Sequence, residues 1–237
     1  MSFGRQKVKM FSTMTSSLLG SLKKGERYEI YTKVKEVPVK TILQLNWIDK
    51  STGLVGFDWG NCTRKGAFQP GSNAYIKLSE ETFLKSKVIS NKQELVLEPT
   101  EECEKPEFLK RRAVRVEVDP LNPVKVKLKV GDKEYQTEAK DISETGVGIV
   151  VRRDTQEGQE ILNLLEKKEN ELIDLDLELP KYGHVHSKGR VGNKEIHDNE
   201  VYIRFGFELD MTEEHKAKVR RYVLERQQEI IKSLSLL

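Results

Sequence analysis

The feature that most constrains the fold is a strict alternation of apolar and charged residues along several short segments. The alternation is clearest at 173–179, where isoleucine and leucines alternate with acidic residues until Pro180 ends the run. A period of two places successive side chains on opposite faces of a strand, so such a segment forms a half-buried strand. Similar runs recur at 28–34, 37–47, 55–59, 124–130 and 147–151. The chain is therefore predicted to be mainly β.

The first half of the chain carries several short strands separated by turn residues. Residues 37–60 are predicted to form a β-hairpin around the turn at 49–53. Many short strands at such intervals favour a closed sheet, because an open edge leaves backbone groups unpaired. Residues 22–100 are therefore expected to form a small antiparallel β-barrel or sandwich, preceded by an N-terminal extension over 1–21.

A linker is expected between the two halves. Residues 98–107 carry two prolines and five glutamates with almost no apolar residue, a composition typical of linkers. The linker is placed at 101–110, and the second domain at 111–237.

The second half continues with strands and ends in a helix. Short strands are expected from 114 onward, including 134–140, 184–192 and 200–208, with a short amphipathic helix at 157–169. A terminal helix follows, for which Asp210 is the expected N-terminal cap, with Glu213 three residues later. The residues expected on its buried face are Val219, Tyr222, Val223 and Ile230.

Composition limits the classes of function. The chain has 237 residues with 41 basic and 38 acidic side chains, a formal net charge of +3, so any anion site must be local. No apolar run approaches the ~18 residues that a membrane span needs, and the N-terminus lacks the apolar stretch of a secretion signal. Two cysteines without CxxC spacing are too few for a disulfide scaffold. A cytoplasmic protein without membrane insertion is expected.

The densest positive patch follows the linker directly. Lys110, Arg111, Arg112 and Arg115 stand within six residues. Guanidinium groups present forked donors that fit phosphate oxygens and the O6/N7 edge of guanine, and they stack on purine rings. This chemistry indicates a guanine nucleotide, whereas charge alone favours a solvated basic linker.

A second polar segment ends the strand predicted at 134–140. Asp141 and Ser143 should project from one face, and Gly146 permits a turn with positive φ or the close approach of a ligand. A carboxylate accepts the paired N1–H and N2–H₂ donors of guanine, and a hydroxyl can serve a base or a phosphate. Taken alone, the segment fits an ordinary β-turn better than a binding site.

Taken together, these two segments resemble the signature of the PilZ family, the bacterial receptors for cyclic di-GMP. The RxxxR motif of the family matches Arg111 and Arg115, and its [D/N]xSxxG motif matches Asp141, Ser143 and Gly146. The separation of the two motifs suits one intervening β-hairpin. The resemblance extends through 189–191, 204–209 and the terminal helix, and it covers about residues 107–232.

The resemblance implies a six-stranded β-barrel with a C-terminal helix, whose flexible arginine arm folds over the ligand when it binds. The arginines would hold the guanine edge and the phosphates, the carboxylate and the hydroxyl would hold a guanine base, and the glycine would let the ligand approach. The implied cyclic di-GMP-binding residues are Arg111, Arg112, Arg115, Asp141, Ser143 and Gly146.

The first half resembles, by position, size and strand content, the N-terminal barrel that precedes PilZ in flagellar-brake-type proteins. The chain is then expected to comprise two small antiparallel β-barrels joined by a short linker. Ligand binding would change the arrangement of the two domains and so regulate a protein partner, such as the flagellar motor or the polysaccharide machinery, in motility, biofilm or exopolysaccharide control.

Other classes of function fit the sequence less well. His184 and His186 can share a strand face, but no cysteine or carboxylate spacing completes a metal site, and no known catalytic motif is present. An enzyme, a metal or a cofactor is therefore not expected. DNA or RNA binding is not expected either, since no aromatic residue interleaves with the basic patch. The alternative that stays open is a PilZ adaptor that binds no nucleotide and acts only through protein contacts, although such adaptors typically lose the motif residues.

Overall fold

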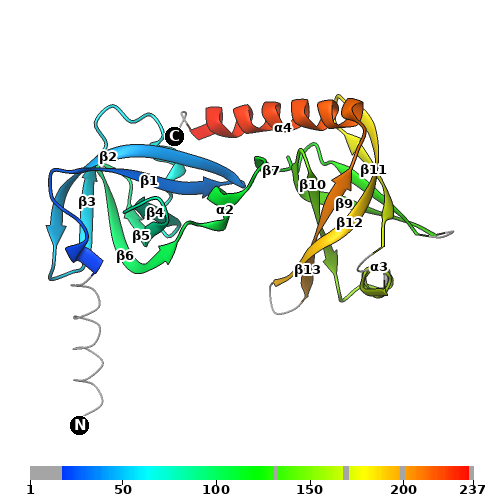
Figure 1. Ribbon diagram of the computed structural model, residues 1–237, viewed down its shortest axis with the longest axis horizontal. Coiled ribbons are helices and arrows are strands. Elements are labelled where there is room, and N and C mark those ends of the chain that lie inside the picture. Colours follow the sequence, from blue (N-terminus) through cyan, green and yellow to red (C-terminus); the bar gives the residue numbers. More distant parts are fainter. Residues whose placement is uncertain (1–17, 131–132, 168–170, 198–200, 235–237) are drawn as a thin grey trace, which may run out of the picture. The chain divides into compact units, whose positions relative to one another are not determined.

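The computed structural model describes residues 18–130, 133–167, 171–197 and 201–234, which fall into two compact units (Figure 1). The first unit comprises Met1–Val34, Pro38–Arg111 and Ile230–Leu237, and the second comprises Lys35–Val37 and Arg112–Glu229. Each unit contains a closed antiparallel barrel of six strands, so the prediction of a mainly β fold with two barrels is confirmed. No helix in the described ranges is both long and apolar enough to cross a membrane.

The first barrel closes in the strand order β1-β2-β3-β6-β5-β4. Apolar residues alternate along its strands and fill the interior, as in β2, where Val39, Leu43 and Leu45 are buried in the core. The hairpin predicted at 37–60 corresponds to β2 and β3, which pair antiparallel. The strands are β1 (Arg27–Val34), β2 (Val37–Asp49), β3 (Leu54–Asp58), β4 (Asn73–Lys77), β5 (Thr82–Ser90) and β6 (Glu94–Glu104), with the short 3-10 helix η1 (Lys65–Ala67).

The predicted N-terminal extension, 1–21, lies mostly outside the described residues, but its end belongs to the first barrel. Leu19, near the end of the extension, is 2% exposed and joins the hydrophobic core of that barrel, as does Leu22 directly after the extension, at 4%. Leu18 is partly buried and packs against the same core.

The prediction of an irregular linker at 98–107 is wrong for most of that segment. Strand β6 continues to Glu104 along β5, and Pro99 lies opposite Ser86. Proline has no backbone N–H to donate to the neighbouring strand. It is tolerated here because the register shift between Lys85 and Ser86 forms a bulge, where that hydrogen bond is not needed. An ion pair of 2.6 Å between Lys85 and Glu101 accommodates one of the acidic residues. The helix α2 (Glu107–Lys110) follows, and the two units divide between Arg111 and Arg112.

The second barrel closes in the order β10-β13-β12-β11-β8-β9, because β9 also pairs with β10, and β7 adds along β9. The strand predicted at 173–179 is confirmed over its full length, and its apolar residues are at most 2% exposed. Its acidic residues face the lysines of β8 across the ladder, which balances the basic face of that strand. The strands are β7 (Arg115–Glu117), β8 (Lys125–Val130), β9 (Lys133–Ser143), β10 (Gly146–Arg152), β11 (Ile173–Leu179), β12 (Gly183–His197) and β13 (Tyr202–Asp210).

Two longer helices complete the second half of the chain. The helix α3 (Gln156–Lys167) confirms the predicted amphipathic helix, and α4 (Glu213–Leu234) is the predicted terminal helix, with the four expected residues buried. The prediction that Asp210 caps this helix is wrong. Asp210 remains paired with Lys188 in the sheet, so the helix begins later, and the hydroxyl of Thr212 accepts a hydrogen bond from the His215 N–H instead.

Candidate functional site

The two predicted motifs meet because β7 lies along the end of β9. Arg115 stands opposite Ser143, and Glu117 stands opposite Asp141. The hairpin between β9 and β10 then places Gly146 opposite Ser143. Four of the six residues predicted from the sequence are therefore neighbours in the second barrel.

Asp141 is buried and is bound by two arginines. The carboxylate, in a residue only 4% exposed, accepts hydrogen bonds from Nε of Arg204 at 3.0 Å and from Nη2 of Arg204 at 2.8 Å. Nε of Arg115 lies 3.4 Å from its Oδ1 atom. Arg204, on β13, is itself 8% exposed. A buried carboxylate is tolerated only when it is paired in this way, so Arg204 holds Asp141 in place.

Gly148 leaves the space that this ion pair occupies. A Cβ at that position would lie 2.8 Å from Nη2 of Arg204 and 2.8 Å from both carboxylate oxygens of Asp141. The sequence analysis did not identify Arg204 as a site residue. Gly148, a glycine within a strand, was the available signal, since such glycines often mark a close approach.

The turn between β9 and β10 presents the hydroxyl and the glycine of the second motif. Oγ of Ser143 donates to the carbonyl of Gly146 at 3.3 Å. Gly146 does not adopt the positive φ that the sequence analysis considered. A Cβ there would lie 2.7 Å from the carbonyl oxygen of Phe207, so glycine is needed for the close packing of β10 on β13.

The turn between β9 and β10 also contacts α4. Glu144 forms an ion pair with Arg220, and the hydrogen bond from this guanidinium lowers the pKa of the Glu144 carboxyl. The contact orients the turn that carries Ser143 and Gly146.

A pocket of about 280 Å³ opens beside these residues. Its wall combines β7, the β9–β10 hairpin, β12 and β13, and it includes Arg115, Ser143 and Asn193. Three of the residues that line it, Gly146, Gly192 and Gly206, are glycines. At two of these positions glycine lets parts of the wall pack closely: a Cβ at Gly146 would meet the carbonyl of Phe207, and a Cβ at Gly206 would overlap the side chain of Asn193.

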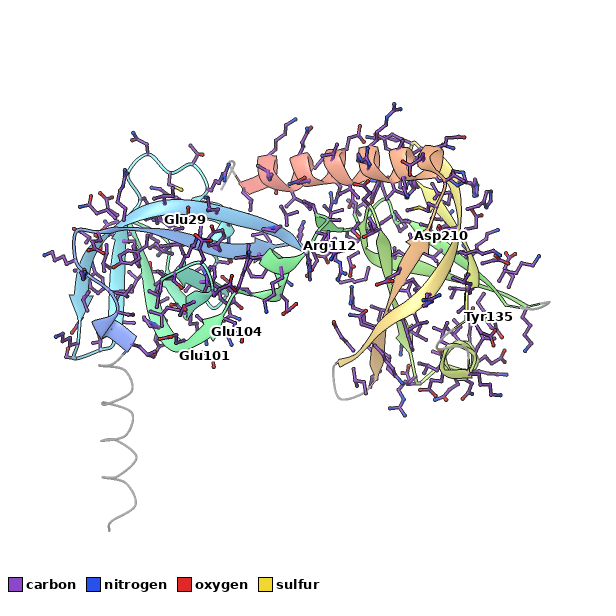
Figure 2. All side chains as sticks on the ribbon, in the orientation of Figure 1. Glu29, Glu101, Glu104, Arg112, Tyr135 and Asp210 are labelled. Atoms are coloured by element: carbon purple, nitrogen blue, oxygen red, sulfur yellow. The ribbon has the colours of Figure 1, made fainter. Side chains whose placement is uncertain are left out.

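The remaining predicted residues lie on the segment that leads into β7. Lys110 ends α2 and forms ion pairs with Glu104 at 3.4 Å and Glu107 at 3.2 Å. Arg111 follows with an extended backbone and is half-buried, whereas Arg112 is exposed. Figure 2 labels Arg112 on the segment between α2 and β7. Neither arginine is among the residues that line the pocket.

Three histidines, His184, His186 and His215, form a polar surface cluster. Nδ1 of His184 lies 3.0 Å from Asp176 and Nδ1 of His186 lies 3.2 Å from the same carboxylate, which stands opposite His186 in the pairing of β11 with β12. The ring of His215 packs edge-on against that of His186 at 5.9 Å. Within the described ranges, no group of three potential ligands has the geometry of a metal site.

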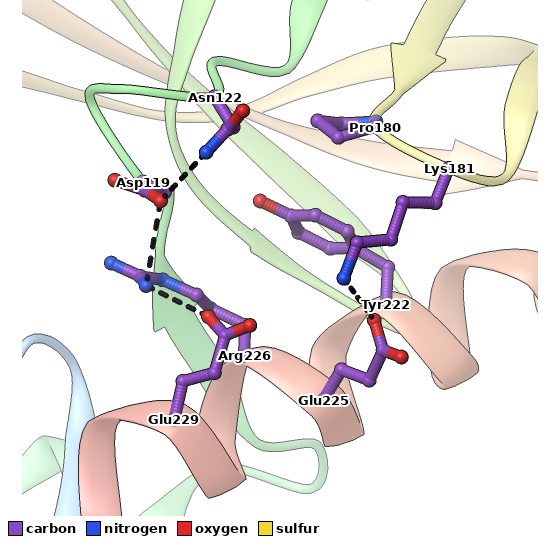
Figure 3. Close-up of a pocket in the computed structure, with 8 residues that line it drawn as sticks. All are labelled: Asp119, Asn122, Pro180, Lys181, Tyr222, Glu225, Arg226 and Glu229. Atoms are coloured by element: carbon purple, nitrogen blue, oxygen red, sulfur yellow. Dashed lines mark hydrogen bonds and ion pairs between the residues drawn. The ribbon is translucent and has the colours of Figure 1, made fainter. Parts of the chain in front are cut away.

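A second pocket of about 250 Å³ lies in the same unit, against α4 (Figure 3). Tyr222 is 6% exposed, and its hydroxyl points toward the loop that carries Asp119 and Asn122. By distance and angle the hydroxyl has no hydrogen-bond partner among the described residues, although the backbone of Asp119 approaches it. Burial raises the pKa of Tyr222 to about 12. None of the predicted ligand residues lines this pocket.

Comparison with known proteins adds sequence relatives and similar structures. The PilZ domain matches residues 109–225. An uncharacterized protein of Aquifex aeolicus is 50% identical over 224 residues, which cover 94% of this chain and 97% of the relative. A second uncharacterized protein of that organism is 35% identical over 167 residues, covering 68% of this chain and 76% of the relative.

Three solved structures are similar over most of the chain. The K. pneumonia MrkH–c-di-GMP complex has 13% identity and a TM-score of 0.49, with 96% of each chain covered. YcgR of Escherichia coli in complex with c-di-GMP has 12% identity and a TM-score of 0.43, with 94% of this chain and 93% of that chain covered. The Bacillus subtilis inhibitor of motility MotI/DgrA has 12% identity and a TM-score of 0.42, with 88% of this chain and 99% of that chain covered.

Proposed function

Because this chain belongs to the PilZ domain family, we propose that it is a receptor for cyclic di-GMP, which binds at the pocket beside Arg115. One observation carries the proposal. Arg115, Ser143 and Gly146 line one pocket of the second barrel, and Asp141 contacts Arg115 beside it. These are four of the five residues at which the two family motifs match, the fifth being Arg111.

Arg115 is the cation that faces the pocket. The guanidinium group of Arg204 is engaged by two carboxylates, those of Asp141 and Glu195, whereas Arg115 contacts Asp141 from the pocket wall. Arg204 is buried, whereas the side chain of Arg115 is 27% exposed and reaches the pocket. An arginine in this position offers forked donors to phosphate oxygens or to the O6/N7 edge of guanine.

Asp141 contributes in this proposal through the arginines that it holds. In the structure its carboxylate oxygens accept from Arg204, and they do not line the pocket. The hydroxyl of Ser143 is placed to serve a base or a phosphate, and Gly146 lets the turn that carries it pack closely on β13.

Arg111 and Arg112 would close over the ligand from the arm that leads into β7. The exposed side chain of Arg112 and the extended backbone at Arg111 are compatible with such a movement. Ordering the arm costs conformational free energy, which several charge-assisted hydrogen bonds of roughly 1.5–3 kcal/mol each would offset.

We further infer that binding changes the arrangement of the two units and thereby regulates a protein partner in motility, biofilm or exopolysaccharide control. The arginine arm adjoins the division between Arg111 and Arg112, which supports this step. Small-angle scattering with and without cyclic di-GMP tests it, and identical scattering curves at saturation would refute it.

Calorimetric titration of cyclic di-GMP into the wild type and into Arg115→Ala tests the receptor function. GTP and cyclic di-AMP serve as ligand controls. Arg152→Ala serves as a matched variant, because Arg152 is exposed and forms its own ion pair with Asp154. Specific binding that Arg115→Ala abolishes and Arg152→Ala retains is expected. A folded wild type that binds none of the three ligands would instead favour an adaptor that binds no nucleotide.

A further inference from the structure

The pairing of β12 with β13 contains a bulge next to the pocket. Val191 pairs with Phe207 and Asn193 pairs with Gly206, so Gly192 has no partner in the ladder. Bulges of this kind redirect the side chains that follow them, and they are frequent beside functional sites. Gly192 and Asn193 both line the pocket that contains Arg115.

Two contacts hold the side chain of Asn193 against the wall of the pocket. Its Nδ2 atom donates a hydrogen bond of 3.1 Å to Oε1 of Glu195. Because a carboxylate only accepts hydrogen bonds, this contact identifies the amide nitrogen and leaves Oδ1 as an acceptor. A Cβ at Gly206 would overlap Oδ1 of Asn193, so the amide rests on a stretch of backbone that only glycine provides.

Asn193 is connected to the motif residues through a chain of polar contacts. Oε1 of Glu195, which accepts from Asn193, lies 3.6 Å from Nη1 of Arg204. Arg204 holds Asp141, which in turn contacts Arg115. Residues on β12, β13, β9 and β7 therefore form one network, and Asn193 is its member on β12.

Asp141, the acceptor expected for the guanine base, is not open to a ligand in this network. Guanine presents N1–H and an exocyclic 2-amino group as donors, and adenine has no amino group at that position. Asp141, the expected acceptor, is buried and engaged by Arg204. Oδ1 of Asn193 offers an acceptor on the wall of the same pocket, held in a defined position before any ligand binds.

We propose that Asn193 reads the guanine base: its Oδ1 atom accepts a hydrogen bond from the 2-amino group of the bound nucleotide. The inference rests on the proposed function and adds to it a residue that determines base specificity. Glu208 is the competing acceptor, since it is exposed and lines the same pocket. Its negative charge disfavours a place beside the phosphates.

A double comparison of residue and ligand tests this inference. The ligands are cyclic di-GMP and cyclic di-inosine monophosphate, which lacks only the 2-amino groups. The proteins are the wild type, Asn193→Ala, Gly206→Ala and Glu208→Gln, with folding checked by circular dichroism. The wild type should prefer cyclic di-GMP by about tenfold, the value of one net hydrogen bond.

Asn193→Ala should lose this preference. Gly206→Ala should weaken it in the same direction, because its methyl group displaces the amide without removing it. Glu208→Gln should keep it.

The outcomes separate the two levels of the proposal. A wild type that binds neither ligand refutes the receptor function and the inference with it. A wild type that binds cyclic di-GMP, combined with an Asn193→Ala variant that retains the preference, refutes only the role of Asn193. Loss of the preference in Glu208→Gln alone would assign the base contact to Glu208 and overturn the inference.

Discussion

Replacing Arg204 with alanine should destabilise the second barrel strongly. The side chains of Arg204 and Asp141 are 9% and 5% exposed and are joined by a two-pronged ion pair. Removing one partner of a buried pair leaves the other charge without compensation, which costs about 3–5 kcal/mol. Nε of Arg115 lies 3.4 Å from Oδ1 of Asp141, but Arg115 lies at the edge of the site and therefore compensates only part of the buried charge.

Amide hydrogen exchange of β9, β10 and β13 measures the effect directly. Both tryptophans, Trp47 and Trp59, belong to the first unit, so their fluorescence during urea unfolding provides a separate reading of that unit. Arg204→Ala should lower the protection of the second barrel. The matched variant Arg152→Ala removes an exposed arginine from a two-pronged pair and should change the protection far less.

A double replacement separates the buried charge from the packing. Arg204→Met combined with Asp141→Leu removes both charges and keeps the volume, so it should recover most of the stability that Arg204→Ala loses. The reasoning is refuted if Arg204→Ala costs less than about 1 kcal/mol, the range of exposed pairs, or if the double variant is no better than the single one.

Three further predictions follow from Gly146 and Tyr222. Gly146→Ala should cost about 1–3 kcal/mol, because its methyl group presses on the carbonyl of Phe207 and strained packing of this kind costs that much; an unchanged melting temperature would contradict this. Tyr222→Phe should leave stability unchanged or higher, because it removes a buried hydroxyl with no partner among the described residues; a urea midpoint well below that of the wild type would show that the hydroxyl is bonded. The pKa of Tyr222 is about 12 in the folded chain, compared with an ordinary value of 10.0. As the pH rises, this residue therefore ionises first in the unfolded state, and the free energy of unfolding falls between these two pH values. Tyr222→Phe should reduce that fall. The assignment is refuted if the unfolding free energy of the variant falls as steeply with pH as that of the wild type.

Local signals were enough to predict most strands. The span of β11 was correct because strict alternation and the following Pro180 are both local features. Signals of the same kind failed where pairing with a distant strand decided the outcome. The acidic, proline-containing segment of β6 is ordered because β5 supplies Lys85 and a bulge, and Asp210 stays in the sheet because β12 pairs with it. Local composition cannot report such partners.

The candidate site was predictable to the extent that its residues belong to neighbouring strands. Arg115, Asp141 and Ser143 are brought together by β7 and β9, and their spacing in the sequence reflects this. Arg204 lies 63 residues from Asp141, and Asn193 reaches the pocket only through the β12 bulge. The glycines that make room for them, Gly148 and Gly206, were local sequence signals of their positions.

A nuclear magnetic resonance titration of the full chain with cyclic di-GMP locates the ligand directly. Saturable shifts are expected at the amides of Arg115, of the β9–β10 hairpin and of the bulge at Gly192 and Asn193, and the amides that surround Tyr222 should be unaffected. An unperturbed spectrum, or shifts confined to the pocket of Tyr222, would contradict the assignment of the ligand site.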